Sequence, residues 1–137
     1  MKLAIYGAQG YALAACEALK TLYPKREVMC FLVSEMGNNA KVLGGLPVRE
    51  IAEFSDGLTE ADKNDVEILI ATPDGVMAEI EETLERYGFS AYRRLDSGRR
   101  DSLMKLFHAK LGRFMPLKAL PVGCSLPELD IFHGKVS

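Results

Sequence analysis

The residues best suited to chemistry form a glycine turn near the N-terminus: Gly7, Ala8, Gln9, Gly10 and Tyr11. They separate an apolar run from a stretch of small residues with helical spacing, and main-chain amides at such a helix start can bind an anion. The two glycines are three positions apart, so the full dinucleotide fingerprint is absent. The turn predicts a small-ligand site in which the Gln9 and Tyr11 side chains add contacts. A tight turn that binds nothing is the alternative.

A second group of polar candidates follows two other apolar runs. Val33, Ser34 and Glu35 end one run, and Thr72 and Pro73 follow another. The carboxyl ends of parallel strands meet at one edge of a sheet, so we expect both groups to line a crevice together with the glycine turn. Glu35 stands about where a dinucleotide-binding fold places the acid that holds a ribose. The alternative for Glu35 is a solvated loop acid.

The sequence shows no catalytic constellation and no metal site. His108 and His133 have no carboxylate or cysteine at ligand spacing. Ser97 and Ser102 belong to no nucleophile elbow. Asp74 is interpreted as the N-cap of a helix rather than as a ligand-binding residue. The chemistry that remains is binding.

These candidates need a scaffold of alternating strands and helices. Strands are predicted over residues 2–6, 27–33, 66–71 and 91–95, and helices over residues 11–22, 74–87 and 101–114. Residues 34–47 are expected to be a loop that ends in a short extended piece at 46–48. The alternation predicts a Rossmann-like three-layer α/β fold with a parallel sheet of four to five strands. The first strand should be central, between the second and the third.

Composition narrows the class of protein. The chain has 137 residues, 48% hydrophobic and 26% charged, with a formal net charge of −2. These values are typical of a globular protein and do not favour nucleic acid as a partner. Cys16, Cys30 and Cys124 show no metal or disulfide pattern, which favours a reducing, cytoplasmic compartment. The sequence shows neither a signal peptide nor a stretch of transmembrane length.

Charge is distributed unevenly along the chain. Residues 93–118 carry eight Lys and Arg against two Asp and Glu, whereas residues 1–92 are acidic. One interpretation is a helix that packs by its apolar stripe and turns its cations to water or to an acidic neighbour. A partner or homo-oligomer surface is a second interpretation, and attachment to anionic lipid headgroups is a third. Nucleic-acid binding is not favoured, because the segment has no matching motif and no aromatic platform.

We expect three parts along the chain. Residues 1–95 form the Rossmann-like domain, residues 96–115 a basic amphipathic helix packed on it, and residues 116–137 a loop-rich tail or linker. The proline- and glycine-rich end also suggests a fragment of a longer protein.

Several segments resemble one known module. They are residues 2–11 (KLAIYGAQGY), the second strand ending in Phe-Leu-Val, residues 44–48 (GGLPV), and the run at 66–71 followed by a helix ending in ERYGF. Together they resemble the N-terminal nucleotide-sugar-binding domain of bacterial sugar acyltransferases, which include sialic-acid O-acetyltransferases and bacillosamine-pathway N-acetyltransferases. A similar module precedes the glycosyltransferase-like domain of some polysaccharide-synthesis proteins. The resemblance covers about residues 1–95.

The resemblance implies a nucleotide-sugar ligand held by Gln9, Gly10 and Tyr11 and by Val33 and Ser34. The family usually has Gly-His-Gly where this chain has residues 10–12, and a pair of acids at residues 33–34. The hexapeptide-repeat β-helix, which in the family supplies the catalytic histidine and the acetyl-CoA site, is absent from this sequence, so acetyl transfer is not implied.

The sequence therefore predicts a non-catalytic or regulatory module of bacterial surface-polysaccharide biosynthesis that binds a nucleotide sugar at residues 7–11. Two alternatives remain open. One is a fragment of an NAD(P)-binding oxidoreductase, and the other is a ligand-free structural or oligomerisation domain.

Overall fold

Three apolar runs form the centre of a parallel sheet. In the computed structural model, which describes residues 2–111, they are β1 (Lys2–Tyr6), β2 (Val28–Val33) and β5 (Val66–Ile70). Nearly all of their residues are buried, as expected for strands covered by helices on both faces. β1 lies between β2 and β5, which confirms the predicted central strand. The tail at residues 116–137, Cys124 and His133 lie outside the described residues.

The described sheet has the order β3-β4-β2-β1-β5-β6. β4 (Leu46–Glu50) pairs in parallel with β2, and β6 (Tyr92–Arg94) pairs in parallel with β5. These five parallel strands agree with the predicted sheet. The addition is β3 (Val42–Leu43), which runs antiparallel to β4 within the segment expected to be a loop. Gly44 and Gly45 both have positive φ (57° and 82°), which suits the tight hairpin turn that joins the two strands.

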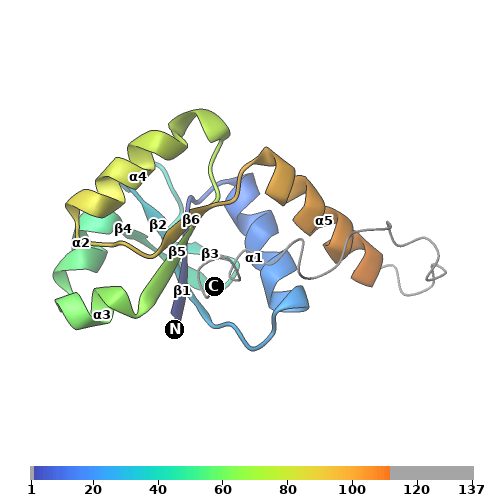
Figure 1. The fold of residues 1–137 in the computed structure, drawn as a ribbon, viewed down its shortest axis with the longest axis horizontal. Helices are drawn as coiled ribbons and strands as arrows, with labels where there is room; N and C mark the ends of the chain where they lie inside the picture. Colours follow the sequence, from blue (N-terminus) through green and yellow to red (C-terminus); the bar gives the residue numbers. More distant parts are fainter. Residues whose placement is uncertain (1, 112–137) are drawn as a thin grey trace.

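Helices cover both faces of the sheet and complete the three layers (Figure 1). One face carries α1 (Gly10–Leu22) and α5 (Ser97–Leu111). The other carries α2 (Ile51–Asp56) and α4 (Met77–Arg86). The short α3 (Glu60–Asn64) precedes β5, and a 3-10 turn, η1 (Asp74–Val76), leads into α4. None of the helices within residues 2–111 has the length and apolar character needed to cross a bilayer.

Each face has its own hydrophobic core because side chains alternate along the strands. Leu3, Ile5 and Phe31 pack beneath α1, whose Ala12 and Ala15 allow the helix to approach the sheet closely. The opposite core is built from the alternate strand positions together with residues of α2 and α4. Cys16 and Cys30 are buried, one in each core, where a free cysteine acts as a small hydrophobic residue.

α1 and α5 lie side by side and run in the same direction. The Arg100 guanidinium lies over the ring of Tyr11 near the start of both helices, with 4.1 Å between Cζ and the ring centroid. Near their ends, Lys110 Nζ donates to the carbonyl oxygen of Thr21 at 2.9 Å. Both helices therefore begin at the same edge of the sheet.

Two details of the predicted helix starts differ in the structure. Asp74 was expected to be an N-cap, but the N-cap of η1 is Pro73, that of α4 is Val76, and neither end has a side-chain capping hydrogen bond. α5 begins at Ser97, four residues before the helical pattern predicted from Asp101 and inside the basic segment expected at residues 96–115. The Asp96 carboxylate accepts a hydrogen bond from the Arg99 amide at 3.0 Å, which is an N-cap contact.

Candidate functional site

The three strand ends named by the sequence meet at one edge of the sheet. The Gly7 amide donates to the carbonyl oxygen of Leu32 at 2.7 Å, and the Ala71 amide donates to that of Tyr6 at 2.9 Å. These bonds place the glycine turn between the segments that follow β2 and β5. The predicted arrangement at the carboxyl ends of the strands is therefore present.

Gly7 makes the sharp exit from β1 possible. Its φ is +130°, and a Cβ at this position would stand 2.7 Å from the main-chain oxygen of Ala71. Only glycine adopts this conformation without strain, and only glycine fits so close to the neighbouring strand. The turn therefore holds the start of α1 directly beyond the tip of β1.

The amino end of α1 has no side-chain cap. Gln9 has the extended conformation of an N-cap residue but makes no capping hydrogen bond. Its Nε2 donates instead to Oδ1 of Asn39 at 3.2 Å. A Cβ on Gly10 would meet no atom within 4 Å, and Tyr11 is 45% exposed. The first turn of α1 is thus approachable from solvent, and the positive end of the helix dipole points to this edge.

The end of β2 contributes a pair of hydroxyl groups. The Tyr6 hydroxyl and Ser34 Oγ are 2.6 Å apart. Burial raises the pKa of the Tyr6 phenol, although the hydrogen bond to Ser34 partly opposes this, so Tyr6 stays neutral at physiological pH. The Val33 side chain is buried in the core beneath α1, whereas Glu35 is exposed.

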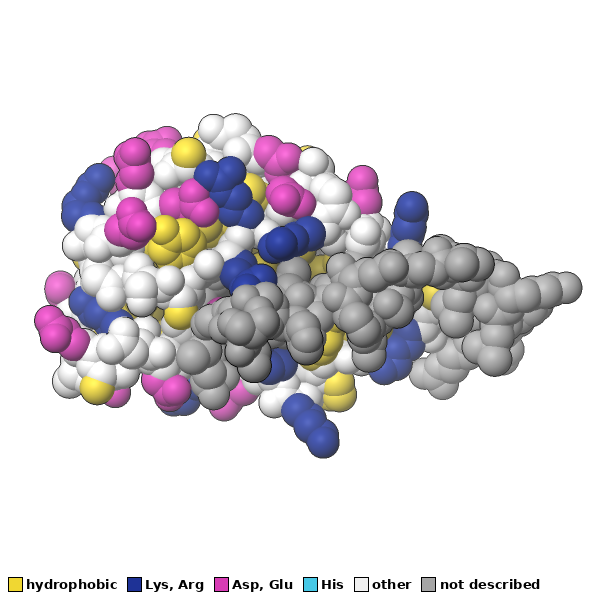
Figure 2. Space-filling view, viewed as in Figure 1, with side chains coloured by type: hydrophobic (Ala, Val, Ile, Leu, Met, Phe, Trp, Pro, Cys, Tyr) yellow, Lys and Arg dark blue, Asp and Glu magenta, His cyan; other side chains and the backbone are white. Residues whose placement is uncertain are grey.

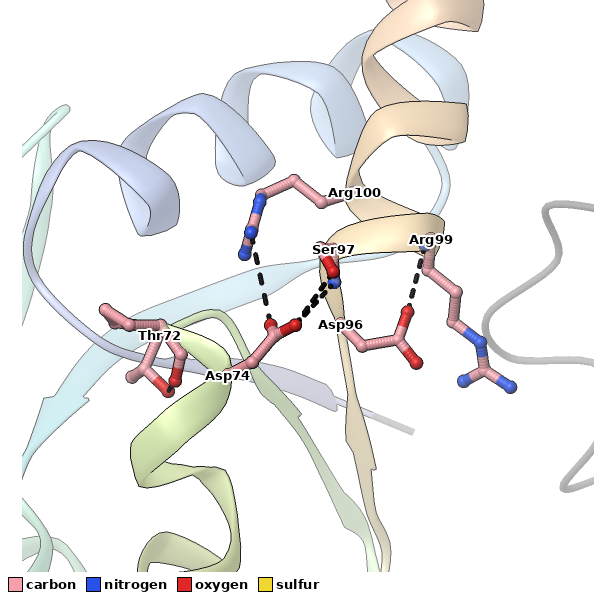
Figure 3. A network of polar contacts seen from close by, with 7 residues as sticks. Thr72, Asp74, Asp96, Ser97, Arg99 and Arg100 are labelled. Atoms are coloured by element: carbon pink, nitrogen blue, oxygen red, sulfur yellow. Dashed lines mark hydrogen bonds and ion pairs between the residues drawn. The ribbon is translucent and has the colours of Figure 1, made fainter.

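The segment after β5 is held by the beginning of α5. Asp74 Oδ2 accepts hydrogen bonds from Ser97 Oγ at 2.8 Å and from the Ser97 amide at 3.4 Å (Figure 3). Thr72 Oγ1 donates to the carbonyl oxygen of Pro73 at 3.4 Å. Asp74 thus occupies the amino end of α5, while no side chain caps that of α1.

Arg100 is the site residue that the sequence interpretation missed. Its side chain reaches from α5 toward Asp74, and its Nη2 lies 4.0 Å from Asp74 Oδ1 (Figure 3). The sequence analysis counted Arg100 only among the cations of the basic segment 93–118 and gave it no role at this edge. Asp96 was the available signal for the start of α5, because aspartate is a favoured N-cap residue.

The arrangement supplies hydrogen-bond donors and a cation rather than a reactive pair. The carboxyl edge of the sheet carries main-chain amides, the hydroxyls of Ser34 and Ser97, and the Arg100 guanidinium. His108 lies at the far end of α5 beside Phe107, with ring centroids 5.6 Å apart. Residues 2–111 contain no group of three or more His, Cys, Asp or Glu side chains that could hold a metal ion. This chemistry suits the binding of an anionic small molecule.

Comparison with known proteins supports the fold. No family model and no curated protein sequence matches the chain. Among solved structures it is similar to a mutant perosamine N-acetyltransferase from Caulobacter crescentus in complex with CoA and GDP-perosamine, with 19% identity and a TM-score of 0.50. The match covers 66% of this chain and 40% of the acetyltransferase chain. This chain therefore shares its fold with part of that acetyltransferase, which confirms the predicted resemblance at the level of the fold.

Proposed function

We propose that this domain is a non-catalytic or regulatory module of bacterial surface-polysaccharide biosynthesis that binds a nucleotide sugar at residues 7–11. One observation carries the proposal: the uncapped amino end of α1 lies beyond the central strand, between two polar strand ends. In open α/β sheets this is the position where phosphate-bearing ligands bind.

Each predicted site residue has a role in this proposal. The amides of Gly10 and Tyr11 face the diphosphate, and Ala8 and Gly7 shape the turn. The hydroxyl of Ser34 and the carboxylate of Glu35 are acceptors for ribose or sugar hydroxyls. The rim of the site is formed by Gln9, Thr72 and Pro73. Val33 contributes only its main chain, because its side chain is buried.

The structural relative adds support of a different kind. That acetyltransferase is in complex with a nucleotide sugar, GDP-perosamine, and with CoA. The part of that chain matched here is a minority of its length, so we transfer only the class of ligand and no acetyl transfer.

A thermal-shift panel tests the proposal. The full chain is heated with UDP-, GDP- and CMP-sugars and, in separate wells, with NAD and NADP. A ligand at a hundred times its dissociation constant should stabilise the fold by about 2.7 kcal/mol. We expect stabilisation by at least one nucleotide sugar and none by the dinucleotides.

Two glycine variants make the test specific. Gly10→Val places a branched side chain in open space at the first turn of α1, so it should block the approach of a ligand without straining the fold. Gly57→Val is the control, because a Cβ there makes only ordinary contacts and follows α2 rather than the site. If a nucleotide sugar stabilises the Gly10→Val variant as much as the wild type, the ligand binds at another site. No response to any nucleotide sugar would leave the structural or oligomerisation role.

A further inference from the structure

The environment of Arg100 is unusual for a charged side chain. It is only 17% exposed, and its guanidinium lies on the ring of Tyr11. Nη1 is buried and has no hydrogen-bond partner among the described residues. The nearest carboxylate oxygen, Asp74 Oδ1, is 4.0 Å from Nη2, which is too far for a hydrogen bond.

Two neighbouring arginines, Arg94 and Arg99, do make hydrogen bonds. Arg94 Nη2 donates to Glu81 at 2.5 Å, and Arg99 Nη1 donates to the carbonyl oxygen of Arg94 at 3.4 Å. A largely buried guanidinium that makes no hydrogen bond is costly. Stacking on an aromatic ring uses the face of the guanidinium and leaves its in-plane N–H groups available. Arg100 is thus held in place by Tyr11, and within residues 2–111 no group accepts a hydrogen bond from its buried Nη1.

The location of Arg100 relates it to α1. Tyr11 is the second residue of α1, so the guanidinium lies beside the uncapped first turn of that helix. Two positive features, a helix amino end and an arginine, therefore occupy the same edge of the sheet. The opposing charge nearest to Arg100 is Asp74, whose Oδ2 accepts hydrogen bonds from Ser97 while its Oδ1 lies 4.0 Å from Arg100 Nη2.

We propose that Arg100 binds the diphosphate of the nucleotide sugar, with Asp74 weakening that binding by its negative charge. This inference rests on the proposed function and adds a residue and a charge balance to it. Guanidinium and phosphate match as a bidentate pair, which satisfies the unused N–H groups. The phosphate then lies between Arg100 and the amides of α1, and Tyr11 keeps the arginine in position.

Calorimetric titration of the full chain tests this assignment. The probes are UDP and GDP, with uridine and guanosine as the matching compounds without phosphate. Arg100→Gln removes the charge and leaves a shorter polar side chain, and it should weaken diphosphate binding by about tenfold or more. Binding of the nucleosides should be unchanged. Asp74→Asn should strengthen diphosphate binding by about threefold, because a neighbouring negative charge is removed.

Two further variants keep the outcomes separable. Arg99→Gln is the control, since this neighbouring arginine is exposed and is not stacked on Tyr11. Arg100→Lys keeps the charge but loses the planar fork, so it should bind the diphosphates with intermediate affinity, and it serves if the glutamine variant fails to fold.

The results distinguish the two proposals. Equal affinity of wild type and both Arg100 variants for UDP and GDP would overturn the role of Arg100 and leave nucleotide-sugar binding intact. If the wild type binds neither diphosphate nor any nucleotide sugar, both proposals are wrong. If Arg99→Gln weakens binding of UDP and GDP as much as Arg100→Gln does, the effect is a general one of charge, and the role assigned to Arg100 is overturned.

Discussion

Two glycines of the same turn differ in what they contribute. Gly7 has a positive φ and stands against the main chain of Ala71, so the exit from β1 depends on it. Gly10 has neither constraint, and a side chain there would reach open space. Gly7 is therefore a requirement of the fold, whereas Gly10 is dispensable for folding and valuable only if something approaches the helix start.

Alanine substitution should separate these roles. Gly7→Ala should lower the free energy of unfolding by about 3 kcal/mol, because strained φ and close contact with Ala71 act together. Gly10→Ala should leave stability unchanged or raise it by up to about 1 kcal/mol. Urea denaturation of both variants measures the difference. Equal losses would mean that the turn has another conformation.

The buried thiol of Cys30 gives a second prediction at this scale. Burial raises its pKa from 9.0 to about 11, with a smaller opposing effect of Arg49. Below pH 9 both the folded and unfolded states keep the proton. As pH rises from about 9 to 11, the unfolded state loses it first, so the free energy of unfolding falls, on the order of 2 kcal/mol for two pH units.

Comparison with Cys30→Ala isolates this contribution from other groups that titrate in alkali. The stability difference between wild type and variant, measured by urea denaturation across the pH series, should shrink above pH 9. A difference that stays constant with pH would show that the thiol is accessible to water in the folded state.

At the scale of elements, α5 determines which side chains reach the candidate site. Leu103 is 1% exposed and lies in the core shared with α1, with Met104 and Phe107 packed against it. Leu111, on the same predicted stripe, is 52% exposed. The first half of α5 is therefore the part anchored by buried contacts, and it is the half that carries Arg100.

Truncation of these two leucines should have unequal effects. Leu103→Ala removes a fully buried side chain and should cost about 3 kcal/mol of stability. Leu111→Ala should cost less than about 0.5 kcal/mol. Thermal and urea unfolding measure both values. Similar losses in the two variants would contradict the packing of α5 described above.

The elements also show what could be predicted from sequence. Continuous apolar runs identified β1, β2 and β5, because a parallel strand covered on both faces is apolar at almost every position. The extended piece expected at residues 46–48 is β4, but its pairing with β3 was missed because β3 has two residues, although Gly44-Gly45 between apolar residues was a usable signal. The meeting of three strand ends followed from topology alone. The Arg100–Tyr11 contact could not be predicted, because it depends on how α5 packs beside α1.

For the whole molecule, part of the charge asymmetry is neutralised within one chain. Acidic side chains gather over the region of α4 (Figure 2), and Glu81 of that helix pairs with Arg94 at 2.5 Å. Arg93 lies 3.8 Å from Glu67, and Arg100 lies 4.0 Å from Asp74. These three arginines of the basic segment thus have acidic neighbours within their own chain, which favours the first of the three interpretations given to the segment.

Association between copies through opposite charges is accordingly not expected. Sedimentation velocity of the full chain should give the same sedimentation coefficient at low and at high salt. Salt screens exposed ion pairs, so it would change the coefficient only if such pairs joined copies of the chain. A coefficient that falls as salt rises would instead support a homo-oligomer held by charge.

The outermost described strands have a consequence for crowded solutions. β3 has two residues and β6 has three, so each border of the sheet exposes few unpaired peptide groups. β6 also carries Arg93 and Arg94, whose like charges oppose stacking of one border on another. The described part of this chain therefore offers few backbone groups to which another strand could add in a growing fibril.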